Sequence, residues 1–229
     1  TNFGLGGEDG LNNENLIDDK TFSANLSYFQ SEDLEWRYGL QVKQLGIEYL
    51  STFGDTVTFD IRENPVEGAG YAKLKWKTGI RMVIEPGVRY NFYSVYADEP
   101  YIDLRLRMKY LLTDDRYINF AVGNYHQFIE TIQDDFNPPI LDNWLAVDES
   151  VDPASATHIV LGYEEYFQDV YRVQIETYYK DIKNMLTYEE IRSSTDAEVS
   201  SGKVRDTFTP SDGYAYGLEL FGQKILGKL

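Results

Sequence analysis

The segment from Tyr101 to Leu112 constrains the fold most strongly, because its residues alternate between apolar and charged with a period of two. One face of the expected strand is apolar and carries Ile102, Leu104, Leu106, Met108, Tyr110 and Leu112. The other face is charged and carries Asp103, Arg105, Arg107 and Lys109. In a soluble β-sandwich such a charged face meets water. In a membrane barrel it lines a wet lumen, while the apolar face contacts lipid.

The composition excludes several classes of protein. Hydrophobic residues make up 42% of the 229 residues, and the 19 Tyr and 12 Phe exceed what a disordered chain carries. A net charge of −17 argues against nucleic acid as a partner, because phosphate binding needs clustered Lys and Arg. The chain has no cysteine, which excludes disulfides and thiolate metal sites within it. The sequence contains no run of about 18 apolar residues, so it predicts no transmembrane helix.

The same alternation recurs along the chain and predicts a single all-β domain over residues 1–229. The predicted strands are nine, at about 21–30, 34–50, 71–78, 80–93, 101–112, 117–128, 156–167, 170–186 and 213–225. Residues 1–20 are predicted to form a loop, and longer polar loops are predicted at 51–70, 94–100, 129–155 and 187–212. A change of apolar phase within 34–50 predicts a bulge near Gln44. Pro86 predicts an irregularity in the hydrogen-bond ladder of 80–93.

Short and long connections alternate along the predicted strands. The breaks near residues 31, 78, 114 and 168 are short, whereas the intervening loops are long and polar. Short turns at one rim and long loops at the other are typical of an antiparallel up-and-down transmembrane β-barrel of the outer membrane. Tyrosines near the expected strand ends fit interfacial aromatic girdles. They are Tyr71, Tyr93, Tyr101, Tyr110, Tyr117, Tyr163 and Tyr214.

Four stretches carry a resemblance to a known family. EPGVRYNFYS, YLLTDDRYINFAVGNYHQF, the segment from LDNWLAVDES to DIKNML, and GYAYGLELFGQK resemble, in order and spacing, the barrel of TonB-dependent outer-membrane receptors of Gram-negative bacteria. The resemblance covers residues 21–229 and implies part of a 22-stranded barrel. It places Thr1 in an extracellular loop and Leu229 at a periplasmic turn.

The resemblance also implies a function and a set of partners. It implies a location in the bacterial outer membrane and energised uptake of a scarce nutrient, with siderophore, cobalamin, haem, glycan and peptide substrates all left open. The implied partners are outer-membrane lipid, TonB acting through a plug domain that the resemblance does not cover, and a surface lipoprotein. The alternative is a soluble all-β binding module that recognises carbohydrate or protein.

Three sets of candidate site residues follow from the alternation. The apolar face listed first, from Ile102 to Tyr110, is predicted to face lipid. A positive stripe is predicted to face the lumen, where it attracts an anionic substrate or pairs with Glu85, Asp103 and plug carboxylates. It comprises Lys73, Lys75, Lys77, Arg81, Arg89, Arg105, Arg107 and Lys109. Aromatic residues at the long-loop end are candidates for stacking on a substrate, or for packing of the loops. They are Tyr93, Tyr96, Tyr125, Phe128 and Trp144.

No catalytic constellation is present in the sequence. There is no cysteine nucleophile and no GxSxG motif, and His126 and His158 fall on separate predicted strands. We expect no enzymatic activity, no cofactor and no metal site, and we interpret the two histidines as ordinary wall residues. Four acidic pairs lack calcium-loop spacing and are expected to be solvated. These pairs are Glu8-Asp9, Asp18-Asp19, Asp134-Asp135 and Asp148-Glu149.

Overall fold

The computed structural model describes residues 2–5, 11–96, 99–132, 143–188, 204 and 208–226. Apart from a 3₁₀ turn at Ser94–Tyr96, the elements of this part of the chain are β-strands. The strands are β1 (Asn2–Leu5), β2 (Leu11–Phe29), β3 (Leu34–Phe53), β4 (Thr56–Glu63), β5 (Val66–Thr78), β6 (Met82–Tyr93), β7 (Tyr101–Thr113), β8 (Arg116–Gln127), β9 (Ile129–Ile132), β10 (Asn143–Ala146), β11 (Ala154–Phe167), β12 (Tyr171–Tyr188) and β13 (Phe208–Lys224).

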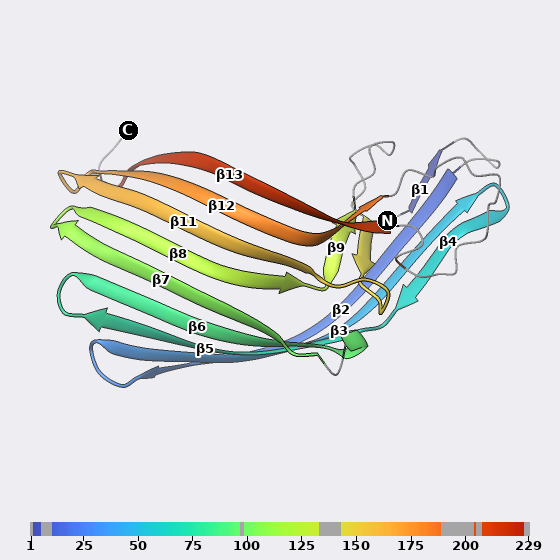
Figure 1. The fold of residues 1–229 in the computed structure, drawn as a ribbon, viewed down its shortest axis with the longest axis horizontal. Coiled ribbons are helices and arrows are strands. Elements are labelled where there is room, and N and C mark those ends of the chain that lie inside the picture. The colour runs from blue at the N-terminus through green and yellow to red at the C-terminus, as the bar shows by residue number, and fades with distance from the viewer. Residues whose placement is uncertain are drawn as a thin grey trace.

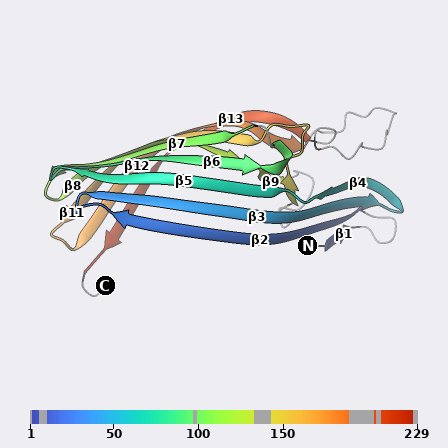
Figure 2. The same cartoon turned by 90° about the horizontal axis from the view of Figure 1, so that it is seen from below.

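The strands form one antiparallel sheet that curves into an open trough (Figures 1 and 2). The strand order is β1-β2-β3-β5-β6-β7-β8-β11-β12-β13, and β4 pairs with β3 beside this path. Among the described strands, only β9 and β10 lie outside this sheet, and they pair with each other as a separate hairpin. The predicted all-β, antiparallel up-and-down architecture is therefore confirmed. Within the described residues the sheet is open, with β1 and β13 at its edges.

The two faces of the sheet differ as the alternation predicts. On the convex face large apolar side chains are exposed, such as Leu104 at 61% and Tyr216 at 73%. The concave face, which is turned toward the β9–β10 hairpin, carries most of the charged residues, because the register aligns them from strand to strand. An apolar outside and a polar inside invert the usual arrangement of a water-soluble sheet.

Tight turns connect the strands at one end of the trough, on the left in Figure 1. Between β11 and β12, Gln168 and Asp169 both have positive φ, 52° and 56°, as a type I′ turn requires. Gly79 adopts a φ of 68° between β5 and β6. The strand ends that flank the longer connections lie at the opposite end, together with β4 and the β9–β10 hairpin. The short and long connections thus lie at opposite ends of the sheet.

Several predicted boundaries are wrong at the long-loop end. The predicted loop 1–20 contains β1 and the first part of β2, which begins at Leu11. The predicted loop 51–70 contains β4 and the start of β5, and the predicted loop 129–155 contains β9 and β10. The loop predicted at 187–212 is shortened, because β12 extends to Tyr188 and β13 begins at Phe208. β1 and the first part of β2 lack the apolar alternation on which the prediction depends, whereas the segment VTFDI of β4 shows it within the predicted loop.

The predicted bulge near Gln44 is also wrong. β2 and β3 pair without a register shift from Leu11↔Phe53 to Phe29↔Glu35. The apolar phase changes because the concave face itself becomes apolar there, and Leu45 and Ile47 are buried. The prediction for Pro86 is confirmed, because the β5–β6 ladder is interrupted between Lys73↔Gly87 and Trp76↔Ile84 while its register is kept.

The apolar core lies at the long-loop end of the trough and not along the sheet. It consists of Tyr93, Phe128, Leu145, Val147, Val151, Leu186, Val204 and Phe208. These residues come from β6, β10, β12, β13 and the connections beside them. The core therefore fixes the hairpin in the mouth of the trough, above a polar concave wall.

Candidate functional site

The β9–β10 hairpin spans the mouth of the trough and is anchored on both sides. On one side the Asn15 side-chain amide donates to the Trp144 carbonyl over 3.1 Å. On the other side the Leu186 backbone N–H donates to Glu130 Oε2 over 2.8 Å. Figure 1 shows β9 lying between the strands of the two sides. The hairpin thus connects β2 to β12, two strands that are far apart in the sheet order.

Burial changes the ionisation of the anchoring glutamate. Glu130 is buried, and burial raises the pKa of its carboxyl above the ordinary value of 4.5, although the Leu186 N–H opposes the rise. On β4, burial likewise raises the pKa of Glu63, with Asp148 and Glu149 adding to the effect.

Three of the five predicted substrate-binding aromatics belong to the packed core or to its border. Tyr93 is fully buried, stacks on Phe128 with ring centroids 4.7 Å apart, and donates its hydroxyl to the Val147 carbonyl over 3.0 Å. Tyr96 packs against this cluster and donates to the carbonyls of Asp148 and Val151. The ring faces of Tyr93 and Phe128 are therefore occupied by protein. Trp144 and Tyr125 line cavities, and Phe128 also borders the cavity that Trp144 lines.

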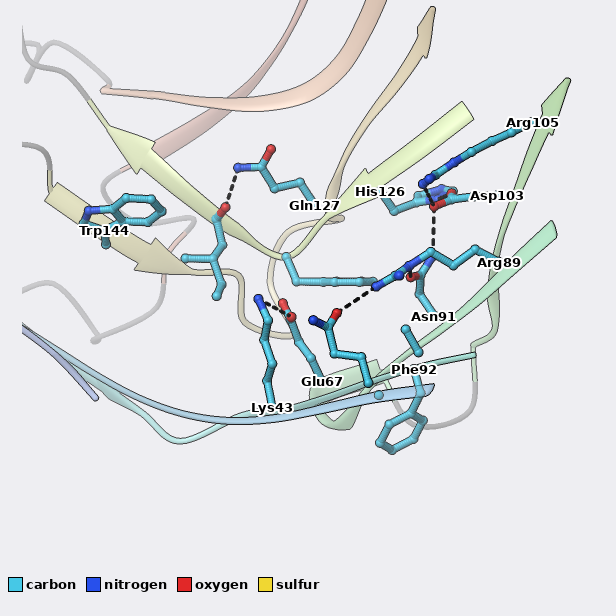
Figure 3. Close-up of a pocket in the computed structure, with 15 residues that line it drawn as sticks. Lys43, Glu67, Arg89, Asn91, Phe92, Asp103, Arg105, His126, Gln127 and Trp144 are labelled. Carbon is cyan, nitrogen blue, oxygen red and sulfur yellow. Dashed lines mark hydrogen bonds and ion pairs between the residues drawn. The ribbon is translucent and has the colours of Figure 1, made fainter. Parts of the chain in front are cut away.

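The first cavity, of about 370 Å³, lies directly beneath the hairpin (Figure 3). Trp144 and Ile129 of the hairpin line it together with Lys43 and Glu67, whose charged groups are 3.7 Å apart. Arg89 also lines it. The Arg89 guanidinium donates to the amide oxygens of Asn91 over 2.7 Å and of Gln41 over 3.1 Å. The cavity thus has an aromatic and aliphatic roof and a charged floor.

Asp103 is the most buried charged residue of this wall, with 2% of its surface exposed. His126 Nδ1 lies 2.7 Å from one carboxylate oxygen, and the Asn91 side chain donates to the other over 3.0 Å. Arg105 is more distant, at 3.4 Å. Figure 3 shows this group gathered at one end of the cavity, opposite Trp144. Asp103 therefore joins β6, β7 and β8.

The second cavity, of about 480 Å³, adjoins the first, and Arg89 and Arg105 line both. Its further lining includes Tyr71, Lys73, Glu85, Gly87, Arg107 and Tyr125. Lys73 and Glu85 form an ion pair of 2.6 Å. The Arg105 guanidinium lies over the Tyr125 ring, 4.4 Å from its centroid. A continuous polar path therefore follows the concave wall from the hairpin downward.

Most of the predicted positive stripe shares one face of the sheet. The register aligns Lys73 with Gly87 and Arg105, and Glu85 with Arg107. Lys75 and Lys109 fall on this face by alternation along their strands, and so does Lys77, whose ammonium donates to the Glu32 carbonyl over 2.9 Å. Arg81 is an exception, because residues 79–81 form the turn and β6 begins only at Met82.

Further along the concave wall, Glu164 accepts hydrogen bonds from side chains of β7, β8, β11 and β12. It is 3% exposed and accepts from Lys109 at 2.9 Å, Arg172 at 2.7 Å and Tyr166 at 2.8 Å. Asn119 donates to it over 3.3 Å. Sequence reasoning missed this group. It did name Glu85 and Asp103 as partners of the positive stripe, and the Lys73–Glu85 and Arg105–Asp103 contacts are present. The signal for Asp103 is that it is the sole acid among the basic positions on its face of β7.

The predicted lipid-facing residues lie on the opposite face. Ile102 and Leu104 are exposed, as is Tyr110, while Leu106 and Met108 are half-buried between neighbouring strands. Each alternates with the charged residues of β7, so all five point to the convex side.

Neither the histidines nor the described acidic pairs form a metal-type cluster. His126 contacts Asp103, and the His158 ring packs against the Tyr125 ring at a tilt of 38°, with centroids 4.7 Å apart. Among the described residues there is no group of three or more His, Cys, Asp or Glu side chains that could hold a metal. Asp148 Oδ2 accepts from the Val204 N–H over 2.9 Å. Glu8-Asp9 and Asp134-Asp135 lie outside the described residues, as do Thr1 and Leu229.

A search of the described residues for membrane-spanning helices found no helix long and apolar enough to cross a bilayer.

Comparison with known proteins identifies the fold. No family model and no curated protein matches the sequence. Among solved structures, the ferripyoverdine receptor of the outer membrane of Pseudomonas aeruginosa is similar with a TM-score of 0.66 and 11% identity, over 96% of this chain and 32% of that one. The siderophore receptor PirA from Pseudomonas aeruginosa gives 0.62 and 11%, over 96% and 38%. The ferric yersiniabactin uptake receptor FyuA from Yersinia pestis gives 0.62 and 14%, over 96% and 35%.

These likenesses concern the fold. The chain has the strand arrangement of the barrel wall of such receptors, and it spans about a third of their length. The resemblance to TonB-dependent receptor barrels is thereby confirmed at the level of the fold.

Proposed function

We propose that the chain forms part of the barrel wall of a TonB-dependent outer-membrane receptor for energised uptake of a scarce nutrient. The observation that carries the proposal is the inverted sheet, with a continuous apolar convex face and a charged, cavity-bearing concave face. In water an exposed apolar surface of this extent is unfavourable, whereas in a bilayer it is the surface that lipid requires. The soluble binding module has no physical reason for such a surface.

The strand lengths support the same proposal. A strand crosses the hydrocarbon core in about 9 to 11 residues, whereas β2, β3 and β12 have 19, 20 and 18. They extend past the membrane on the long-loop side, which we assign as extracellular. The open edge along β13 needs hydrogen-bond partners that lipid does not offer. We therefore assign the remaining wall to further strands of a larger barrel, of the 22 strands that the resemblance implies.

Substrate binding is proposed on the extracellular side, without covalent chemistry. The cavity beneath the β9–β10 hairpin combines Trp144 with the charged groups of Lys43, Glu67 and Arg89. The three similar structures are named as siderophore or ferric-siderophore receptors, which supports an iron chelate among the substrate classes. TonB, a plug domain, outer-membrane lipid and a surface lipoprotein are the partners of this proposal.

The proposal is tested by locating and weighing the native polypeptide. Outer and inner membranes and the soluble fraction are separated, and the denatured mass of the polypeptide that contains this chain is measured. We expect it in the outer membrane, with a mass of about 70 kDa or more for barrel and plug together. A polypeptide of 26.4 kDa that stays in buffer without detergent would overturn the proposal and favour the soluble binding module.

A further inference from the structure

We propose that Arg89, Arg105 and Arg107 form an anion-binding subsite on the concave wall, which takes a carboxylate or phosphate group of the solute. The inference rests on the proposed function, because it places the solute inside the barrel. It goes further by assigning a ligand chemistry to the lower of the two cavities.

Two glycines open the space between these side chains. Lys73, Gly87, Arg105 and Gly123 pair in one row across β5, β6, β7 and β8. Gly87 has no side chain and so leaves the space between Lys73 and Arg105 open. A Cβ at this position would fit without a clash, because its nearest neighbouring atom would be 3.6 Å away. At Gly123 a Cβ would approach the Arg105 Cγ to 3.1 Å. Gly87 therefore lines the lower cavity with backbone alone, between Lys73 and Arg105.

The arginines around the lower cavity are incompletely neutralised. None of the described carboxylates forms a salt bridge with Arg89 or Arg107, and the donors of Arg89 engage neutral amide oxygens. Arg105 has only a 3.4 Å contact with Asp103, whose oxygens are shared with Asn91 and His126. By contrast, Lys73 is closely paired with Glu85. The excess charge at this point therefore resides on guanidinium groups, which bind carboxylate and phosphate through paired N–H donors.

Two of the three arginines are held in place before any ligand arrives. Arg89 is fixed between Gln41 and Asn91, and Arg105 lies over the Tyr125 ring. Less side-chain freedom is then lost on binding, which favours affinity. The cavity volume of about 480 Å³ is in the range of small-molecule sites.

The local potential can be measured without knowing the ligand. The chain has no cysteine, so one can be introduced as a reporter. Ala121 pairs with Arg107 and lines the lower cavity, and A121C therefore places a thiol at the subsite. The complete protein is purified in detergent, with any cysteine elsewhere changed to serine. Modification rates are compared for an anionic sulfonatoethyl and a cationic trimethylammonioethyl methanethiosulfonate. T56C on the exposed β4 is the reference.

We expect the anionic-to-cationic rate ratio at A121C to exceed that at T56C by about tenfold, because Glu85 is paired with Lys73 and the remaining charged groups of the lining, Arg89, Arg105 and Arg107, concentrate anions. Adding R107Q or R89Q lowers the ratio severalfold. Adding R62Q, which removes an equal charge from β4, leaves the ratio unchanged. Succinate and inorganic phosphate, added separately, slow the modification of A121C, and the stronger competitor identifies the preferred group.

Two results overturn the subsite. One is a ratio at A121C equal to that at T56C, or a ratio insensitive to R89Q and R107Q. The other is the failure of both reagents to reach A121C, which means that a protein segment and not the solute covers the cavity. Both results are independent of the proposed function, which fails only if the native polypeptide is absent from the outer membrane.

Discussion

Replacing Glu164 with alanine is the sharpest test of how the concave wall is held together. The change removes the one carboxylate that Lys109 and Arg172 share, at 2.9 and 2.7 Å, and also the acceptor of Tyr166 and Asn119. Removing one partner of a fully buried ion pair costs about 3 to 5 kcal/mol. Here the side chains of Lys109 and Arg172 are 41% and 29% exposed, so water partly replaces the lost contact. We therefore expect E164A to lower the free energy of unfolding by about 1 to 3 kcal/mol.

The neighbouring residue provides a matched control. Glu165 carries the same charge but lies on the opposite face, where it pairs with a half-exposed Arg116 at 3.0 Å. An exposed pair of this kind contributes about 0 to 1 kcal/mol. Unfolding of the complete protein by guanidinium in lipid vesicles, followed by heat-modifiable gel mobility, compares E164A with E165A. Equal losses in the two variants would refute the argument that Glu164 joins the strands.

Three further predictions concern the sheet and the β9–β10 hairpin. Gly39→Ala places a Cβ within 2.1 Å of the Tyr71 ring and should cost about 1 to 3 kcal/mol in the same unfolding assay, whereas Gly222→Ala, with no atom nearby, should cost nothing measurable. The pKa of Glu130 is raised in the folded state, so its protonated form stabilises the fold below pH 4.5, and this contribution is lost as the pH rises through the pKa of the folded state. E130Q should flatten this pH dependence of the unfolding free energy. An unchanged pH profile of unfolding would contradict the prediction. Leu106→Asp should reduce the heat-modifiable, folded fraction in membranes, and full tolerance would argue against a lipid-facing position.

The sequence predicts the part of the fold in which physical constraints act on both faces. The prediction of 101–112 differs from Tyr101–Thr113 by one residue, because lipid and lumen impose opposite polarity on alternate positions. The first residues of β2, LNNENLIDDK, have no such pattern, since both of their faces lie beyond the bilayer. The four-residue strands β9 and β10 are too short to show any period.

The candidate site was predictable in its face but only partly in its pairs. Pairing of Glu85 and Asp103 with the positive stripe was predictable, whereas the Asn91 and His126 contacts of Asp103 were not. Alternation places Arg105 and Asp103 on the same side of β7, yet the partners of Asp103 come from β6 and β8 through the inter-strand register. Register depends on where each turn ends, and the turn at 79–81 is longer than the Thr78-Gly79 pair suggests. The same error placed Arg81 on the predicted wall, although the residue lies in the turn.

The cationic side chains of the concave wall fall into two groups, one neutralised by a nearby carboxylate and one not. Around Glu164, Lys109 and Arg172 share a carboxylate within 3 Å, and neighbouring groups complete its hydrogen bonds. Around Gly87, by contrast, Arg89 and Arg107 form no salt bridge with a described carboxylate. Unpaired charge lowers the stability of a folded wall, so a position that keeps it is expected to be used in binding. The paired group should therefore respond to mutation with a change in stability, and the unpaired group with a change in ion preference at A121C.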